Sequence, residues 1–261
     1  MAEPIRKEET NNVIELRVVD GKLFKKPAVR YNKDGSIDKR HPNRVAGVSS
    51  EVYPFTTKEE IKAVIDVFNK HIEEATNENQ RQIAHRNKMM FLVGANSSLR
   101  ASDLIGLKWS FFYDSNREFK NMDSLQPKKT RKTGKFVKVF FNEAAKKAIA
   151  SYVEKYPVED LDEYMFKSRK GNGAISENSL WRIMSNTAIE AGIEKNIGSH
   201  SLRKTFGYWA WHDAKDKNKA LVALQQIFRH SSTQVTLRYI GLMDSEIEDV
   251  FNDVNIGLDY I

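Results

Sequence analysis

Two histidines, an arginine and a tyrosine lie close together near the end of the chain. His200 and Arg203 are separated by three positions, and His230 and Tyr239 follow on the C-terminal side. Arginine binds the non-bridging oxygens of a phosphate bidentately. Histidine transfers protons near neutral pH, and tyrosine supplies an oxygen nucleophile. These residue types predict phosphoryl transfer that requires no metal ion.

Elements that could position this set precede it in the chain. Arg100 and Asp103 lie three positions apart on a predicted short helix, with Leu99, Leu104 and Leu107 packed beneath. At this spacing Asp103 can brace the guanidinium of Arg100, or the two can form an ordinary surface ion pair. The apolar residues 108–114 then predict a strand.

Residues 123–142 predict a basic β-hairpin, because their pattern is strand, turn, strand with the turn at Lys132, Thr133 and Gly134. A lysine at a hairpin tip can reach into a groove, and the surrounding positive charges can meet phosphates or remain a solvated loop. The basic residues of this hairpin are Lys128, Lys129, Arg131, Lys132 and Lys135.

Most of the remaining chain predicts helices. Thr56 or Thr57 is expected to cap the first of them, and Asn142 and either Ser176 or Asn178 are expected to cap two others. We expect an α+β, mostly helical domain with one small antiparallel sheet. The predicted helices are 58–75, 82–96, 143–156, 179–192, 201–214, 218–228, a short one that carries Tyr239, and 243–254; residues 163–168 predict a short strand.

The charge of the chain favours a polyanionic partner, with nucleic acid first. The formal net charge is +7, the pI is about 9.3, and all 42 basic residues but only 29 of the 35 acidic ones lie in residues 1–239. That part therefore has a net charge of +13. The chain has no cysteine, which excludes disulfides and thiolate metal sites. It also lacks an apolar run that could span a bilayer and a signal-peptide pattern, which predicts a cytoplasmic protein.

The two ends differ in composition from the middle. Residues 1–55 are basic and rich in turns, with a predicted hairpin, and they are expected to be an arm or a partly disordered leader. Residues 56–243 are the predicted catalytic domain. Residues 244–261 are acidic and predict a tail helix that docks on a neighbouring protomer, shields the basic groove, or packs on its own domain.

Three segments together resemble the tyrosine recombinase (phage integrase) family. They are SLRASDLIGLKW, HSLRKTFG and RHSSTQVTLRYIG, and the resemblance covers roughly residues 55–245. The family has, in this order, an arginine in a short helix, a hairpin lysine, a His-x-x-Arg pair, a later histidine or tryptophan, and a tyrosine nucleophile. The residues that match these places are Arg100, Lys132, His200, Arg203, His230 and Tyr239.

The sequence departs from the family in three places. Ser98 and Arg229 stand where the family often has glycine, and either change could alter a local turn. About 55 residues precede the catalytic domain, fewer than the family's helical core-binding domain contains. The expectation is a fragment, a single-domain member, or an extension that does that job differently.

The resemblance implies metal- and ATP-independent cleavage and rejoining of DNA through a 3′-phosphotyrosyl intermediate. Tyr239 would be the nucleophile, His200 would assist proton transfer, and Lys132 would protonate the leaving oxygen. Arg100 and Arg203 would bind the phosphate, and His230 would orient it. The expected partner is double-stranded DNA, bound by a homotetramer, in a prokaryotic cell or a phage or mobile-element system. Further expected DNA-backbone contacts are Lys128, Lys129, Arg131, Lys135, Arg169, Lys170 and Lys204.

Two other functions fit the same residues. A DNA-binding accessory or regulatory protein would keep the fold without turnover, although it would have no chemical reason to keep all six catalytic residues. An enzyme similar to the type IB topoisomerases would use the same chemistry to relax DNA without exchanging strands. A covalent protein–DNA adduct separates the first alternative from an active recombinase, and strand exchange separates the second.

Overall fold

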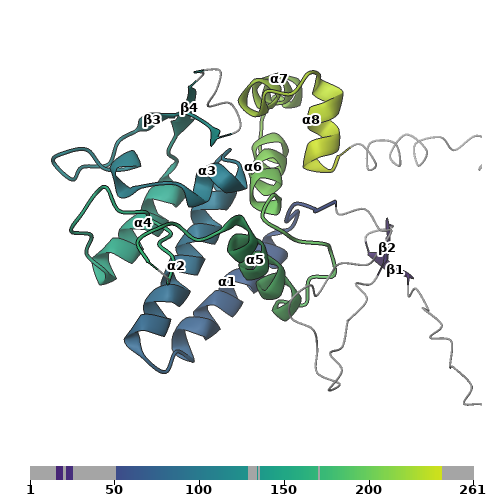
Figure 1. Cartoon of the computed structure of the whole chain (residues 1–261). Coiled ribbons are helices and arrows are strands. Elements are labelled where there is room, and N and C mark those ends of the chain that lie inside the picture. The colour runs from purple at the N-terminus through teal and green to yellow at the C-terminus, as the bar shows by residue number, and fades with distance from the viewer. Residues whose placement is uncertain are drawn as a thin grey trace, which may run out of the picture. The chain divides into compact units, whose positions relative to one another are not determined.

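The computed structural model describes residues 16–19, 22–25, 51–128, 134, 136–169 and 171–242 (Figure 1). It confirms a mostly helical α+β fold in which the predicted basic hairpin supplies a two-stranded antiparallel sheet, with Met122 opposite Phe140. From Glu51 onward the elements are α1 (Lys58–Glu73), α2 (Glu78–Ala95), α3 (Ala101–Ile105), the 3-10 helix η1 (Trp109–Phe111), β3 (Met122–Leu125), β4 (Val137–Phe140), α4 (Glu143–Lys155), α5 (Glu177–Glu190), α6 (Ser201–His212), α7 (Lys217–Phe228) and α8 (Thr233–Ile240).

The predicted hairpin in the N-terminal arm is also present. Strands β1 (Leu16–Val19) and β2 (Lys22–Lys25) pair antiparallel, with Leu16 opposite Lys25. They belong to a separate unit from the helices, whose unit begins at Glu51. The rest of the predicted arm and the acidic tail 244–261, including the expected helix 243–254, lie outside the described residues.

Short polar caps set the helix starts, as predicted. Thr57 and Glu60 form a capping box at α1, in which Thr57 Oγ1 accepts from the Glu60 N–H at 3.1 Å and the Glu60 carboxylate accepts from the Thr57 N–H at 3.3 Å. At α4 the Asn142 side chain accepts from the Ala145 N–H, and at α5 the Ser176 side chain accepts from the Ser179 N–H, without the reciprocal bond of a capping box. These local hydrogen bonds satisfy N–H groups that the first turn of a helix leaves unpaired. None of the described helices has the length and apolar character to cross a membrane.

Two of the predicted strands are wrong. Residues 108–114 contain the 3-10 helix η1, and residues 163–168 form no strand; the two segments meet only through the isolated bridge between Lys108 and Tyr164. Their apolar side chains are explained by burial instead, because Trp109, Phe112 and Phe166 all lie in the core. A short apolar run indicates burial but does not distinguish a strand from an irregular buried segment.

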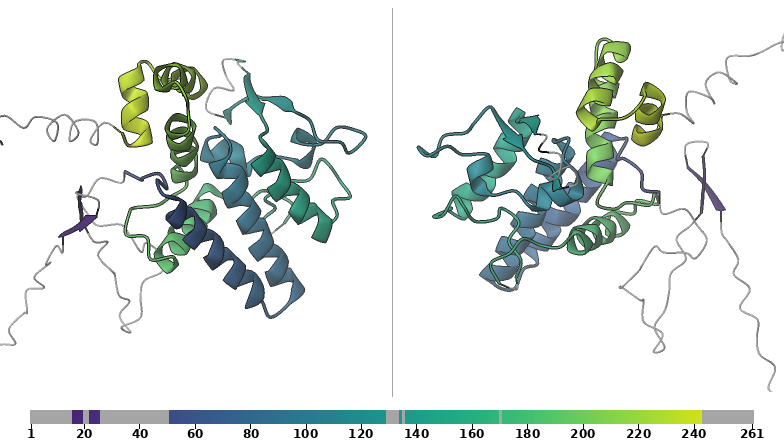
Figure 2. Two further views of the ribbon diagram at one scale, coloured as in Figure 1. Left: turned by 180° about the vertical axis from the view of Figure 1, so that it is seen from behind. Right: turned by 45° about the horizontal axis from the view of Figure 1, so that its top comes forward.

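Helix α6 joins two hydrophobic clusters. It packs against α2 of the main core on one side and against α7 and α8 on the other, as Figures 1 and 2 show. The smaller cluster consists of Leu224, Phe228, Ile240 and Leu242, with Tyr239 partly buried against it. The position of Tyr239 therefore depends on how closely α6, α7 and α8 pack.

Gly207 permits that close packing. A Cβ atom at this position would lie 2.6 Å from Ile240 Cγ2 and 2.8 Å from two ring atoms of Phe228. Both neighbours are buried, so neither has free space into which it could move. The absence of a side chain at Gly207 thus sets the separation of α6 from α8.

We expect Gly207→Ala to destabilise the protein by about 1–3 kcal/mol, because overpacking outweighs the roughly 1 kcal/mol by which alanine is ordinarily favoured in a helix. Urea unfolding of the two proteins measures the difference. Gly173→Ala is the matched control, since a Cβ there meets nothing within 4 Å. A Gly207→Ala protein as stable as wild type would contradict this packing.

Candidate active site

Arg100 lies at the start of α3, where it occupies the N-cap position with extended backbone rather than the helix itself. Asp103 is buried, and its Oδ1 accepts a hydrogen bond from the Lys128 backbone N–H at 2.9 Å. Among the contacts of the described residues there is no ion pair between Arg100 and Asp103, so the expected bracing is not formed. Asp103 instead fixes the backbone where the basic hairpin loop begins, and the guanidinium of Arg100 is left available for a ligand.

Arg203 is held in the first turn of α6 and is only 6% exposed. Its guanidinium donates to the carbonyl oxygens of Ser98 and Phe228, the second at 3.4 Å, and it stacks on the Phe228 ring with 4.5 Å between the guanidinium carbon and the centroid. Its positive charge opposes the rise in the pKa of Tyr239 that burial causes, so the two side chains lie close together. Arg203 therefore connects the segment before Arg100 to the segment that carries His230 and Tyr239.

The turn between α7 and α8 holds His230, and α8 holds Tyr239. The His230 Nδ1 is hydrogen-bonded to Thr236 Oγ1 at 3.1 Å, and its ring lies edge to face with Tyr239 at 5.0 Å between centroids. Ser232 caps the start of α8, and Gly241 ends it with a left-handed φ of 84°. The short helix thus places Tyr239 one turn after the buried Thr236 and against His230.

Burial and positive charge together lower the pKa values of both histidines below their ordinary 6.5. For His230 the charges after burial are Arg203 and Arg100; for His200 Arg203 is the largest of several charges, and Arg100 contributes. His200 remains exposed, so its loss of hydration is partial. Both rings are therefore neutral at pH 7. Because the unfolded chain binds these protons more readily, their contribution to stability falls as the pH drops below 6.5.

Burial also acts on the tyrosine and the arginine. It raises the pKa of Tyr239, against the opposing effects of Arg203 and Arg100, so the phenol is protonated at neutral pH. It lowers the pKa of Arg203 to about 10, which leaves the guanidinium charged. Arg100 also lies near enough to Arg203, His200, His230 and Tyr239 for its positive charge to lower the pKa of each. These five residues form the candidate active-site cluster; Lys132, the sixth predicted member, lies outside the described residues.

Lys204 differs from the expectation of a DNA-backbone contact. It is 6% exposed, its Nζ lies 3.1 Å from Glu51 Oε1, and it is 5.3 Å from the centroid of the Tyr239 ring. An ammonium enclosed in this manner faces the Tyr239 ring rather than the solvent. The structure thus places Lys204 in support of Tyr239, a role that its sequence pattern did not indicate because Glu51 is far away in the chain.

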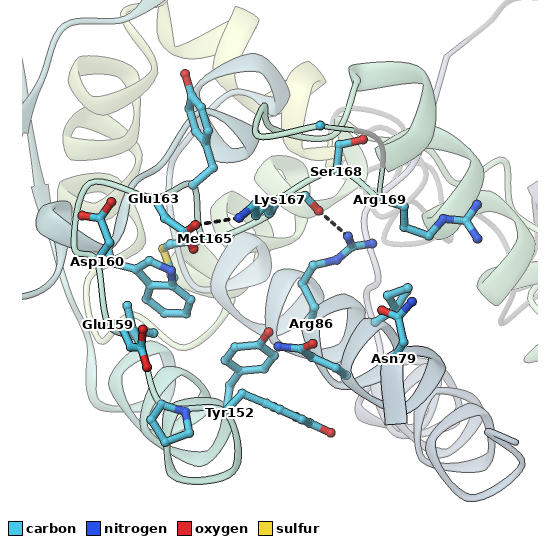
Figure 3. A pocket seen from close by; sticks show the side chains of 18 residues that line it. Asn79, Arg86, Tyr152, Glu159, Asp160, Glu163, Met165, Lys167, Ser168 and Arg169 are labelled. Atoms are coloured by element: carbon cyan, nitrogen blue, oxygen red, sulfur yellow. Dashed lines mark hydrogen bonds and ion pairs between the residues drawn. The ribbon is translucent and has the colours of Figure 1, made fainter. Parts of the chain in front are cut away.

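The other predicted DNA contacts lie apart from one another. Lys128 is exposed beside Asp103, and Arg169 is exposed at the rim of a pocket of about 550 Å³ (Figure 3). That pocket lies between α2, α4 and residues 157–171. Inside it Arg86 donates to the Lys167 carbonyl at 2.6 Å, and Lys167 Nζ donates to Glu163. Lys129, Arg131, Lys135 and Lys170 lie outside the described residues.

No group of three or more His, Asp or Glu side chains that could hold a metal ion is present in the part of the chain that the structure describes.

Comparison with known proteins decides the family. The model of the phage integrase family matches residues 54–246. The chain belongs to the phage integrase family. This is a family of tyrosine-type recombinases, and the match spans all five members of the candidate active-site cluster.

Curated relatives agree with this family. The chain is 36% identical over 157 residues to the probable integrase/recombinase YoeC of Bacillus subtilis, which covers 60% of this chain and 78% of that protein. It is 28% identical over 134 residues to the tyrosine recombinase XerD of Corynebacterium glutamicum, which covers 49% of this chain and 42% of XerD. The chain therefore spans less than half the length of that XerD.

Solved structures show the same fold. The crystal structure of the XerA recombinase matches with a TM-score of 0.54 and 21% identity over 80% of this chain and 68% of XerA. The XerH site-specific recombinase in a post-cleavage complex with its palindromic difH substrate matches with a TM-score of 0.52 and 17% identity. That match covers 85% of this chain and 59% of XerH. The fold of this domain is thus that of the tyrosine recombinases.

The proximity of Arg100 to the cluster can be measured without DNA. We expect Arg100→Ala to raise the pKa values of both His200 and His230, because it removes a positive charge that disfavours their protonation. NMR titration of the imidazole resonances measures both values. Arg81→Ala is the matched control: it should raise the pKa of His85 and leave the other two unchanged. Unchanged His200 and His230 in Arg100→Ala would place Arg100 away from the cluster.

Proposed function

We propose that this protein is a site-specific DNA recombinase that cleaves and rejoins DNA through a 3′-phosphotyrosyl intermediate, without ATP or a metal ion. The Tyr239 oxygen attacks the phosphorus, the bond from phosphorus to the 5′ oxygen breaks, and the phenol proton leaves the tyrosine. The energy of the broken bond is stored in the new phosphotyrosine. Attack by the 5′ hydroxyl of another strand then reverses the step and exchanges partners.

Each member of the cluster has a role in this reaction. Arg100 and the charged Arg203 bind the non-bridging oxygens and stabilise the charge of the pentacoordinate state. His200, neutral at pH 7, accepts the Tyr239 proton. His230 orients the phosphate through Nε2, because its Nδ1 is hydrogen-bonded to Thr236 Oγ1. Lys132 protonates the leaving 5′ oxygen.

One observation carries this proposal: Arg100 and Arg203, from separate parts of the chain, lie close to His200, His230 and the half-buried Tyr239. Placing two permanent cations near one another, with one of them buried, disfavours folding unless an anion offsets their charge. A phosphodiester is such an anion. The basic composition of residues 1–239 fits a DNA partner of the same chemistry.

The wider assembly is part of the proposal. We infer that the protein acts on two duplexes as a homotetramer in the prokaryotic cytoplasm, with Lys128 and Arg169 among its backbone contacts. The bacterial source of the relatives supports the setting. Binding to DNA should weaken steeply with salt, because each phosphate contact releases counterions.

We expect Tyr239→Phe to abolish covalent attachment to DNA while DNA binding persists, because only the nucleophilic oxygen is removed. The probe is a pool of short nicked duplexes with randomised sequence on each side of the nick, which traps the adduct when the cleaved strand diffuses away. Adducts that survive SDS are recovered and sequenced. Tyr208→Phe, in the same hydrophobic cluster, is the matched control and should form adducts as wild type does.

The two alternative functions give different outcomes. An accessory DNA-binding protein would bind duplexes and form no covalent adduct with any of them. That result would contradict the proposed recombinase function. A relaxing enzyme would form the adduct and relax supercoiled plasmid, but two duplexes with the selected site would not exchange strands. A Tyr239→Phe protein that still formed adducts would assign the nucleophile to another residue.

A further inference from the structure

The turn that carries His230 has an unusual residue before it. Arg229 adopts a left-handed conformation with φ 57° and ψ 46°, at the position after α7. The turn closes through the Arg229 N–H to Gln226 O at 3.1 Å and the His230 N–H to Gln225 O at 3.0 Å. Helices commonly end in this manner with glycine, because a Cβ makes the conformation unfavourable by about 1 kcal/mol or more. An arginine here keeps a backbone strain that glycine would remove.

The side chain of Arg229 makes a contact that glycine could not. Its Nη2 donates a hydrogen bond of 3.0 Å to the backbone carbonyl of Phe136, which lies 93 residues earlier and directly before β4. Figure 1 and the left view of Figure 2 show β4 beside α7. The bond therefore joins the base of the β3–β4 hairpin to the turn that holds His230.

The hairpin depends on contacts of this kind for its position. Its two strands are four residues each, and a lone two-stranded hairpin of that size is marginally stable in water. Val139 points into the core, but Phe136 and Phe140 on the other face are 61% and 71% exposed. The core therefore holds one face of β4, and Arg229 holds Phe136, the residue directly before β4, from the side of the α7–α8 turn.

We propose that Arg229 is a positioning residue that ties the residue before β4 to the turn that carries His230, and that proton donation by Lys132 depends on this tie. This inference rests on the proposed function of Lys132 as the general acid. Lys132 precedes Phe136 by four residues, a span of at most roughly 14 Å of chain, so the position of Phe136 limits how far the lysine can reach. A general acid must lie within hydrogen-bond reach of the oxygen that it protonates. The strained backbone at Arg229 persists because this contact requires an arginine.

A bridging sulfur in the substrate tests this role directly. When sulfur replaces the 5′ oxygen at the scissile phosphate, the leaving thiolate needs no proton, so a misplaced acid no longer matters. The duplex selected by the wild-type protein is made once with oxygen and once with sulfur. Cleavage of both is compared for wild type, Arg229→Gly and Arg229→Ala, with Lys138→Ala as the control that removes a positive charge from the same strand.

We expect Arg229→Gly to cleave the oxygen substrate slower by on the order of tenfold or more, a part of the hundredfold or more that a positioned acid contributes. It should cleave the sulfur substrate at the wild-type rate, and it should melt no lower than wild type because glycine relieves the strain. Arg229→Ala should share the kinetic defect and melt below Arg229→Gly. Lys138→Ala should cleave both substrates as wild type does.

Other results overturn the inference. Wild-type cleavage of the oxygen substrate by Arg229→Gly would remove any positioning role. Equal slowing on oxygen and sulfur, with the salt dependence of binding reduced by about one counterion, would make Arg229 a phosphate contact instead.

Amide hydrogen exchange tests the contact between Arg229 and the hairpin without DNA, and therefore independently of the proposed function. If wild type forms no adduct with any duplex, the proposed function fails, and the structural tie is still measured by exchange of the amides in Val137–Phe140 without DNA. Those amides should exchange faster in Arg229→Gly than in wild type. Unchanged exchange would show that Arg229 does not hold the hairpin, and would overturn the inference by itself.

Discussion

The guanidinium of Arg203 is a permanent charge enclosed by protein, and the arrangement of the catalytic domain follows from the need to satisfy it. Removing a charge from water is costly unless hydrogen bonds and aromatic faces replace the lost hydration. Here the replacements come from Ser98 O and from the carbonyl and ring of Phe228, and Tyr239 lies close by. These groups belong to three separate stretches of the chain. Enclosing one charge therefore brings the candidate active-site residues together.

This arrangement makes Arg203 both a structural and a chemical residue. The same guanidinium that would bind a phosphate also holds the carbonyls that position the start of α3 and the end of α7. Loss of Arg203 would leave buried acceptors without donors, so a defect in such a variant reports on folding as well as on catalysis. Arg100, which has no ion pair among the described residues, is the arginine whose loss reports more directly on phosphate binding.

Local sequence was enough to predict most helices and the identity of the cluster. Thr57, Asn142 and Ser176 were recognisable as caps because capping depends on residues only three or four positions apart. The segment 108–114 was misread as a strand because burial of Trp109 and Phe112 against distant residues gives the same apolar pattern. The six proposed catalytic residues were predicted by type, order and resemblance, and the five that lie within the described residues are close together.

What local sequence could not predict depends on long-range contacts. The burial of Lys204 follows from its pairing with Glu51, and Asp103 binds a backbone N–H at Lys128 instead of Arg100. In the sequence, Arg229 stood out only as a departure from the family's glycine that could alter a local turn, and its left-handed backbone was not predicted. Its partner, the Phe136 carbonyl, could be identified only once the hairpin and the α7–α8 turn were both placed. Helix and strand propensities and hydrophobic periodicity depend on neighbouring residues, so they cannot predict contacts between residues this far apart in the sequence.

The segment that leads into α1, residues 51–57, transmits mechanical force to α6. The backbone of Phe55 is attached to α6 at both ends: its N–H donates to Thr205 Oγ1 and its carbonyl accepts from Trp209 Nε1, each at 2.9 Å. Glu51 is attached to the same helix through Lys204. Tension applied to the chain ahead of Glu51 is therefore borne first by α6, the helix that starts at His200 and Arg203. A force on the chain N-terminal to the domain therefore reaches His200 and Arg203, the two candidate active-site residues at the start of α6.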